Sequence, residues 1–296
     1  MPEFPDVEVY IEALEGRVLG KALTRLEITN PFVLRTVDPP VSAFAGKVVQ
    51  RLSRIGKRIV FSVEDDLHIV VHLMIAGRFQ WSAGAPKRKG LARWHFEHGS
   101  VVLTEAGTKR RASLHLVRGE EALEGLDPGG AEVHSLSFDD FRHLVATHNH
   151  TLKRFLTDPR LLSGIGNAYS DEILHDARLS PVRLTSHLDD AECRALYDAT
   201  RSVLVAWRDR LRAHYGERFP SRVTAFREGM AVHGRYGEPC PRCETAVQRI
   251  RYAEHETNYC PRCQTDGKLL ADRALSRLLK EDWPRTIDEL ERQQTR

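Results

Sequence analysis

Long apolar runs are absent from the sequence: none approaches the roughly 18 residues that a membrane-spanning helix needs. The N-terminus lacks the charged-then-apolar pattern of an export signal, so we expect a cytoplasmic protein. Cysteine is scarce, with five residues in 296. Four of them sit in two close pairs and Cys193 stands alone, which in a chain without an export signal favours metal binding over disulfides. A large excess of one charge is also missing, because the formal net charge is +3, so total charge neither requires nor excludes nucleic acid.

The length allows two domains, and the residue pattern changes along the chain. The region 2–130 is mostly β-prone, because short β-branched or alternating segments are separated by glycine or acidic turns. One exception is a helix predicted to start just after Pro5, where apolar residues recur near helical spacing. The predicted strands are 58–63, 68–81, 94–104 and 112–117.

A turn-rich linker at 126–133 precedes a region that is mostly helical. We assign the helical region to residues 131–235 and a small cysteine-containing module to 236–266. The last segment, 267–296, contains a polar stretch with a helical pattern at 271–283, and the sequence gives the segment no role. The pattern predicts an α+β fold with two domains.

Two Cys-x2-Cys pairs are the most specific local signal. Sixteen residues separate Cys240 and Cys243 from Cys260 and Cys263, and these residues are β-prone enough to form a hairpin. Four thiolates at this spacing bind one Zn²⁺ in a closed, structural site. The alternative is two reduced or disulfide-bonded pairs. Cys193 lies in a helical stretch and is expected to be a small buried side chain.

Basic residues cluster in two predicted turns, 86–90 and 108–111, where they either reach a phosphate backbone or are simply solvated. Lys57 is more specific. We expect it to open a strand and to share a face with the apolar Ile59 and Phe61. A lysine there either extends to the sheet edge or faces a cleft.

Residues 150–181 combine a short helix, a glycine-rich turn and the start of a second helix. Gly164 and Gly166 let backbone N–H groups approach an anion, and the following helix N-terminus adds its dipole. Lys153 and Asn167 can add side-chain donors. The pattern indicates either a phosphate clamp or a tight corner whose glycines serve packing.

The chain begins MPEFPDVEVY, with Pro2 followed closely by the acids Glu3 and Asp6. A terminus is usually frayed and free to vary. The stretch is either an ordinary first segment or a place where the α-amine takes part in chemistry.

Together these segments resemble the Fpg/Nei family of DNA glycosylase/AP lyases. MPEFPDVEVY is similar to the family's Met-Pro-Glu-Leu-Pro-Glu-Val-Glu, LKRFLTDPRLLSGIGNAYSDEIL to its helix–two-turn–helix, and HGRYGEPCPRC…NYCPRCQ to its C-terminal zinc finger. The resemblance runs from residue 2 to about 264. It implies an N-terminal catalytic β-sandwich with a leading helix (2–130), a helix–two-turn–helix DNA-binding domain (131–235) and a zinc finger (236–266).

The resemblance implies that Pro2, exposed when Met1 is removed, is the nucleophile that attacks C1′ of a damaged nucleotide. Glu3 would be the neighbouring acid/base, and Lys57 would contact phosphate near the reaction centre. A secondary amine suits this role because the resulting iminium stays cationic without a proton, which promotes β-elimination and then δ-elimination. The amine attacks unprotonated, so a modest lowering of its usual pKa of roughly 8 suffices near neutrality.

The same resemblance implies that Lys153 and Asn167 hold phosphates from the helical side and that Lys109 takes the place of a DNA-contacting arginine. His255 departs from the family, because the finger usually has an arginine there; a permanent phosphate fork is replaced by a partly charged group. δ-Elimination is the step that this change affects.

Two further departures concern the gap left by a flipped base. HLMIAG is similar to the family's His-Leu-Gly-Met-Ser-Gly, and it places Ile75, with Met74 beside it, where a methionine usually fills that gap. The loop 104–113 lacks the family's phenylalanine wedge, so either Arg110 or a methionine would serve. These positions read the lesion and the opposite base.

We therefore expect a monomeric bifunctional glycosylase/AP lyase with one structural zinc, acting in the bacterial nucleoid on double-stranded DNA with a damaged base or an abasic site. The Phe4-Pro5 dipeptide is more similar to the family's formamidopyrimidine/8-oxoguanine branch than to its oxidised-pyrimidine branch. One alternative is a Nei-like enzyme for oxidised pyrimidines or other unusual lesions. Another is a non-catalytic zinc-finger protein that binds damaged DNA.

Overall fold

The chain forms two compact units. The first contains Met1–Gly130 and Val205–Ala225, and the second contains Ala131–Leu204 and Phe226–Arg296. The division falls inside helix α6 (Asp190–Tyr215), so the last part of this helix belongs to the first unit. The computed structural model describes residues 1–84, 90–106, 109–221, 227–252, 255–271 and 284–294.

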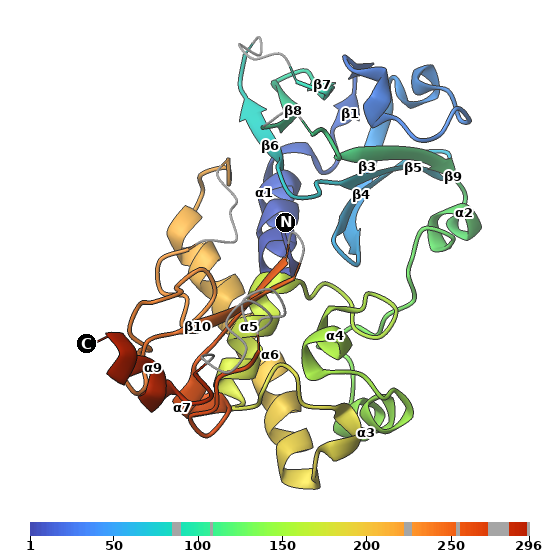
Figure 1. Cartoon of the computed structure of the whole chain (residues 1–296). Coiled ribbons are helices and arrows are strands. Elements are labelled where there is room, and N and C mark those ends of the chain that lie inside the picture. The colour runs from blue at the N-terminus through green and yellow to red at the C-terminus, as the bar shows by residue number, and fades with distance from the viewer. Residues whose placement is uncertain (85–89, 107–108, 222–226, 253–254, 272–283, 295–296) are drawn as a thin grey trace. The chain divides into compact units, whose positions relative to one another are not determined.

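The first unit is built on two antiparallel sheets with strand orders β1-β3-β4-β5-β9 and β2-β7-β8-β6 (Figure 1). The first sheet contains β1 (Ala22–Leu23), β3 (Lys47–Ile55), β4 (Arg58–Val63), β5 (Leu67–His72) and β9 (Ser113–Arg118). The second contains β2 (Arg25–Ile28), β7 (Ala92–Phe96), β8 (Gly99–Glu105) and β6 (Gly77–Ser82). Besides α1 (Phe4–Val18) and the last part of α6, the described residues of this unit form the short helices η1 (Pro31–Val33), η2 (Val41–Phe44) and α2 (Glu120–Glu124).

The two sheets enclose one apolar core with a cluster of aromatic rings at its centre. Phe61 of the first sheet stacks on Trp94 of the second at 5.6 Å between ring centroids. Phe79 meets both rings edge-on. Helix α1 (Phe4–Val18) lies along β3 and β4 and adds Tyr10 to the core (Figure 1). The predicted sandwich with a leading helix is thereby confirmed.

The strand predicted over 68–81 is wrong in one respect, because it is two strands, β5 and β6. The break is a tight turn in which the Gly77 N–H donates to the Leu73 carbonyl at 2.9 Å. A Cβ at Gly77 would lie 2.2 Å from that carbonyl oxygen, so only glycine fits. The strand predicted over 94–104 is likewise divided into β7 and β8.

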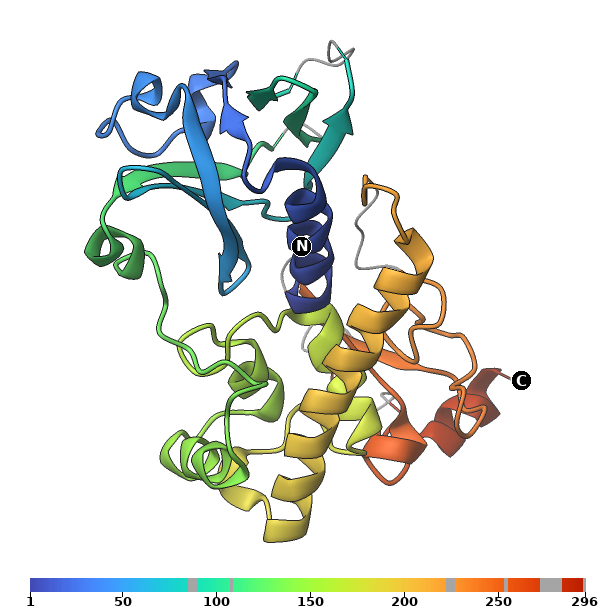
Figure 2. The same ribbon diagram turned by 180° about the vertical axis from the view of Figure 1, so that it is seen from behind.

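The second unit is mostly helical and carries the cysteine pairs (Figure 2). The hairpin predicted between the cysteine pairs is confirmed as β10 and β11. The predicted polar helix over 271–283 falls almost wholly outside the described residues. Besides the first part of α6, the elements are α3 (Phe138–Thr147), α4 (Leu152–Thr157), α5 (Asn167–Asp176), η3 (Thr185–His187), β10 (Gln248–Tyr252), β11 (His255–Tyr259), α7 (Pro261–Gln264) and α9 (Ile287–Gln294).

The compact units group the chain differently from the predicted regions at one point. Residues 205–225 belong with the sheets, whereas the sequence grouped them with the helical region 131–235. The reason is a small apolar cluster in which Leu211 and Tyr215 of α6 pack on Val9 of α1. Among the helices of the described residues, none combines the length and the apolar character that crossing a membrane requires.

Candidate active site and metal centre

The first residues of the chain are held in place rather than frayed. Pro2 is buried, and Glu3 and Asp6 are each only 2% exposed. The Asp6 carboxylate accepts a hydrogen bond from the Glu3 N–H at 2.9 Å, and this bond caps the N-terminus of α1. Pro5 lies in the first helical turn, where its missing N–H costs nothing. Two buried acids therefore flank the chain's amine.

The α-amine at Met1 lies in a charged and partly buried environment. Burial is the main influence, and it lowers the pKa of this amine below its usual 8.0. The carboxylates of Glu3 and Asp6 act in the opposite direction. The cations of Arg78 and Lys57 add to the lowering. The surroundings thus favour the unprotonated amine while keeping two carboxylates close to it.

Lys57 is close to this amine, but its predicted place in a strand is wrong. Gly56 and Lys57 form the turn between β3 and β4, and Arg58 opens the strand. A turn residue is not bound by the alternation of the pleat. The two alternatives that the sequence left open, the sheet edge and a cleft, assumed that Lys57 lies in a strand, and this assumption does not hold.

His72 was missed by the sequence analysis as a member of this cluster. It ends β5 and is paired across the sheet with Arg58 of β4. Burial, followed by the charges of Arg58 and Lys57, lowers the pKa of His72 to about 4. The imidazole is therefore neutral near pH 7 and has one N–H donor. The available signal was its position as the first residue of HLMIAG.

The candidates for filling a base gap lie in two loops of the first unit. Met74 and Ile75 are in the turn between β5 and β6; Met74 has a left-handed φ of 53°, and Ile75 is 56% exposed. Arg78 donates from Nη1 to the Ile75 carbonyl at 3.2 Å, which fixes this turn. Lys109 and Arg110 are exposed in the loop between β8 and β9.

In the second unit, Lys153 and Asn167 are bonded to the protein itself. Lys153 Nζ donates to the Asn167 carbonyl at 2.7 Å and to the carboxylate of Asp171. Asn167 Nδ2 donates to the Glu256 carbonyl of β11 at 2.8 Å. An ammonium has three donors, so Lys153 retains one beyond these two bonds. Their first role in the structure is to join α4, α5 and the hairpin.

Asp171 is the centre of this network and is completely buried. Besides Lys153, it accepts hydrogen bonds from His233 Nδ1 at 2.8 Å and from the Asn258 N–H at 3.2 Å. The neighbouring Glu172 accepts three backbone N–H bonds, from residues 231–233. Helix α5 is thus bonded to the loop before the first cysteine pair and to β11. His255 begins β11, and its side chain is outside the described residues.

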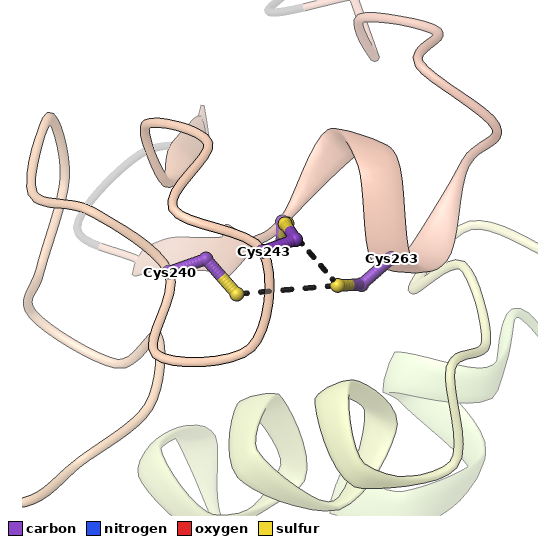
Figure 3. Close-up of side chains that lie close together, drawn as sticks. Cys240, Cys243 and Cys263 are labelled. Carbon is purple, nitrogen blue, oxygen red and sulfur yellow. Dashed lines mark hydrogen bonds between the residues drawn. The ribbon is translucent and has the colours of Figure 1, made fainter.

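Four cysteines converge in a small cluster. The ligand atoms of Cys240, Cys243, Cys260 and Cys263 all lie within 4.8 Å of one another. Figure 3 shows three of them, with Cys263 3.5 Å from Cys243 and 4.0 Å from Cys240, sulfur to sulfur. A tetrahedral zinc with Zn–S bonds of about 2.3 Å needs sulfurs about 3.8 Å apart. Disulfides would need about 2.05 Å. The donor set therefore fits a four-thiolate metal site.

Three sequence models of protein families match the chain. They are the formamidopyrimidine-DNA glycosylase N-terminal domain over residues 1–113, the formamidopyrimidine-DNA glycosylase H2TH domain over 125–207, and the zinc finger found in FPG and IleRS over 237–265. A formamidopyrimidine-DNA glycosylase from Heliobacterium modesticaldum is 32% identical over 279 residues, which cover 89% of this chain and 100% of the relative.

Solved structures give the same likeness. A complex between a mutant of Lactococcus lactis FPG and a Fapy-dG containing DNA has a TM-score of 0.77 at 25% identity, and it covers 89% of this chain and 100% of its own. A complex between the wild-type Lactococcus lactis FPG and an oxidized pyrimidine containing DNA has a TM-score of 0.78 at 26% identity, with the same coverage.

Proposed function

Because the chain belongs to the formamidopyrimidine-DNA glycosylase family, we propose that it is a DNA-repair glycosylase and AP lyase. Its substrate is double-stranded DNA that carries an oxidised base of the formamidopyrimidine/8-oxoguanine type. The observation that carries the proposal is the partly buried α-amine, with two carboxylates and two cations beside it. Removal of Met1 would leave Pro2 at the start of the chain, beside the same four charged groups.

In the proposed reaction, the lone pair of the Pro2 nitrogen forms a bond to C1′ of the damaged nucleotide. The glycosidic C1′–N bond breaks, and its electron pair leaves with the base, which takes up the proton that the Pro2 nitrogen loses. Glu3 gives a proton to O4′ as the sugar ring opens, which yields the C1′ iminium. Loss of a proton from C2′ then expels the 3′ phosphate. The damaged base must first leave the stack, which costs a few kcal/mol.

Phosphate contacts are assigned to the cationic residues around these sites. In the first unit, Lys57 would hold the phosphate near the reaction centre, and Lys109 would contact the backbone. In the second unit, Lys153 would use its remaining N–H, and Asn167 would contact phosphate beside it. His255 would replace the usual arginine of the hairpin. Met74, Ile75 and Arg110 are the candidates for the gap left by the base.

The four-thiolate cluster is proposed to hold one zinc ion. Zinc bound by four thiolates has no open position, so it serves the fold of the finger and not the chemistry. We further propose that the protein acts as a monomer on bacterial DNA. Metal analysis should find close to one zinc per chain in freshly purified, folded protein, and its absence would contradict the cluster's assignment.

Borohydride trapping on an abasic duplex tests the proposed chemistry. Parent protein should give a covalent complex, because borohydride reduces the iminium to a stable amine. Pro2→Gly should lose most of it, and intact-mass analysis of active protein should show Met1 removed. No complex with the parent, or an undiminished one with folded Pro2→Gly, would favour a protein that only binds damaged DNA.

A second candidate is an enzyme for oxidised pyrimidines. A solved relative of similar fold binds an oxidized pyrimidine containing DNA. The altered gap-filling residues, Ile75 above all, also leave the choice of base open. A panel of duplexes, each with one defined lesion, separates the two: faster excision of oxidised pyrimidines than of formamidopyrimidine or 8-oxoguanine would favour the second candidate.

A further inference from the structure

The chain continues past the matched zinc finger, which ends at residue 265, and folds back onto it. Asp266 and Gly267 both have left-handed φ angles, 50° and 81°, and they reverse the chain direction. Beyond them, Lys268 pairs with Thr286 in an antiparallel bridge, and the Leu269 N–H donates to the Arg285 carbonyl at 2.8 Å. We call the described residues 267–271 and 284–294 the C-terminal clamp.

Helix α9 of the clamp packs on α7, as both views show near the C-terminus (Figures 1 and 2). Its first residue, Ile287, is 1% exposed, and the Ile287 N–H donates to the Gly267 carbonyl at 2.8 Å. Arg262 of α7 reaches across to α9, with Nη2 2.7 Å from Asp288 Oδ1 and 3.7 Å from Glu291 Oε2. Two ion pairs thus join the helices, and Ile287 fixes the start of α9 beside Gly267.

The clamp contacts the chain on both sides of the second cysteine pair. Before Cys260, the hydroxyl of Tyr259 accepts a hydrogen bond from the Leu270 N–H at 2.8 Å. After Cys263, the hydroxyl of Thr265 donates to the Lys268 carbonyl at 2.6 Å. Cys260 directly precedes α7 and Cys263 lies within it, and this helix of only four residues is far too short to be stable alone. The geometry of this pair therefore depends on outside contacts.

The first cysteine pair has the same sequence, Cys-Pro-Arg-Cys, but its arginine contacts a different helix. Arg242 Nη1 donates to the His175 carbonyl at the end of α5, 2.9 Å away, and its other end lies 3.6 Å from Asp176. The arginine of each pair thus ties its cysteines to a neighbouring helix. For the first pair that helix is α5, and for the second pair it is α9.

We propose that the C-terminal clamp holds Cys260 and Cys263 in metal-binding geometry and slows the loss of the metal. The proposal rests on the four-thiolate zinc site of the proposed function. It gives the last residues of the chain a role, namely to support the second cysteine pair as α5 supports the first.

The contacts of α9 differ in how much they are expected to stabilise its docking. The Arg262 side chain is 47% exposed and the Asp288 side chain 63%, so water and salt screen this pair and it contributes little. Ile287 is fully buried, and removing its methyl groups leaves a cavity under α9. Docking of α9 should therefore depend mainly on Ile287 and only weakly on the acids.

The test measures the rate of zinc release from the full-length, zinc-loaded protein in an excess of a chromogenic chelator. Ile287→Ala should speed release on the order of tenfold, because a buried contact is lost. Asp288→Asn with Glu291→Gln should speed release about twofold, the scale of exposed ion pairs, and high salt should remove the difference. The double variant changes exposed residues only, so it keeps the test decisive if Ile287→Ala does not fold.

The matched control is Asp139→Asn with Asp198→Asn, which removes two exposed carboxylates of α3 and α6 and makes the same change in net charge. It should release zinc at the parent rate. Parent protein with one zinc per chain, together with an unchanged rate in folded Ile287→Ala and in the acid variant, overturns the clamp alone. Parent protein without zinc overturns the metal assignment and the clamp with it.

Discussion

At the scale of single residues, the chain's first amine is tuned by groups of opposite effect. Asp6 raises its pKa, whereas Arg78 lowers it, against a background of burial that also lowers it. If Pro2 is the attacking amine, each neighbour sets the pH at which the nucleophile becomes free.

Asp6→Asn and Arg78→Gln should therefore shift the pH profile of borohydride trapping in opposite directions. Loss of the Asp6 charge lowers the pKa of the amine, so the rising limb moves to lower pH. Loss of the Arg78 charge raises the pKa, so that limb moves to higher pH. Asparagine still offers an oxygen to the Glu3 N–H, so α1 keeps its cap. Shifts of the same sign in both variants would contradict a role for these charges.

The sequence indicated part of this cluster and missed the rest. Pro2 and Glu3 were singled out because they are adjacent to the terminus and match a family motif. His72 was missed because a histidine inside a β-prone segment looks the same whether it packs or faces a site. Lys57 was placed in a strand because alternation alone does not reveal where the turn ends. Residues far apart in sequence become neighbours only through strand register.

At the scale of elements, a buried charge joins α4, α5 and β11. The Asp171 side chain is fully buried, and the side chain of its partner Lys153 is 15% exposed to solvent. Removal of one member of such a pair leaves the other charge uncompensated in a poorly hydrated place. Loss of this pair should thus destabilise α5, which follows the glycine-rich turn, together with β11 of the cysteine hairpin.

Asp171→Asn should lower the free energy of unfolding by about 3 kcal/mol, measured by urea denaturation. Adding Lys153→Met should recover part of this loss, because no buried charge then lacks a partner. The exposed Asp139→Asn serves as the control and should change stability by less than about 0.5 kcal/mol. Simple additivity of the two buried substitutions would argue against the pair as the cause.

Secondary structure was predicted where one pattern continues without a break. The hairpin between the cysteine pairs and the helix at the start were both foreseen. The break between β5 and β6 was not, because apolar residues continue through the tight turn at Leu73 and Gly77. What ends the strand is a backbone constraint that adds no polar residue to the pattern.

At the scale of the whole molecule, the residue pattern predicted an α+β fold with two domains. The joint resemblance of three motifs then added the sandwich and the helix–two-turn–helix. The part of α6 beyond Leu204 could not be assigned from the sequence, because an amphipathic helix does not show which core it covers. Its contacts with Val9 decide this in the folded chain.

Binding to duplex DNA should weaken steeply with salt, because phosphate contacts release condensed counterions. Each neutralised phosphate should contribute about −0.9 to the slope of log K against log salt. Lys57→Gln should reduce the slope by about that amount. Arg25→Gln, which removes a cation that is ion-paired with Glu27 on β2, is the control. A flat salt response of the parent would contradict the proposed phosphate contacts.

The shared helix α6 has a practical consequence for dissecting this protein. A fragment that stops near residue 130 would contain every strand of the two sheets but would lack Leu211 and Tyr215. Val9 would then face water, and an exposed apolar patch would appear on α1. Limited proteolysis or expression of separate halves should therefore give aggregating pieces, whereas internal trimming that retains 205–221 should not.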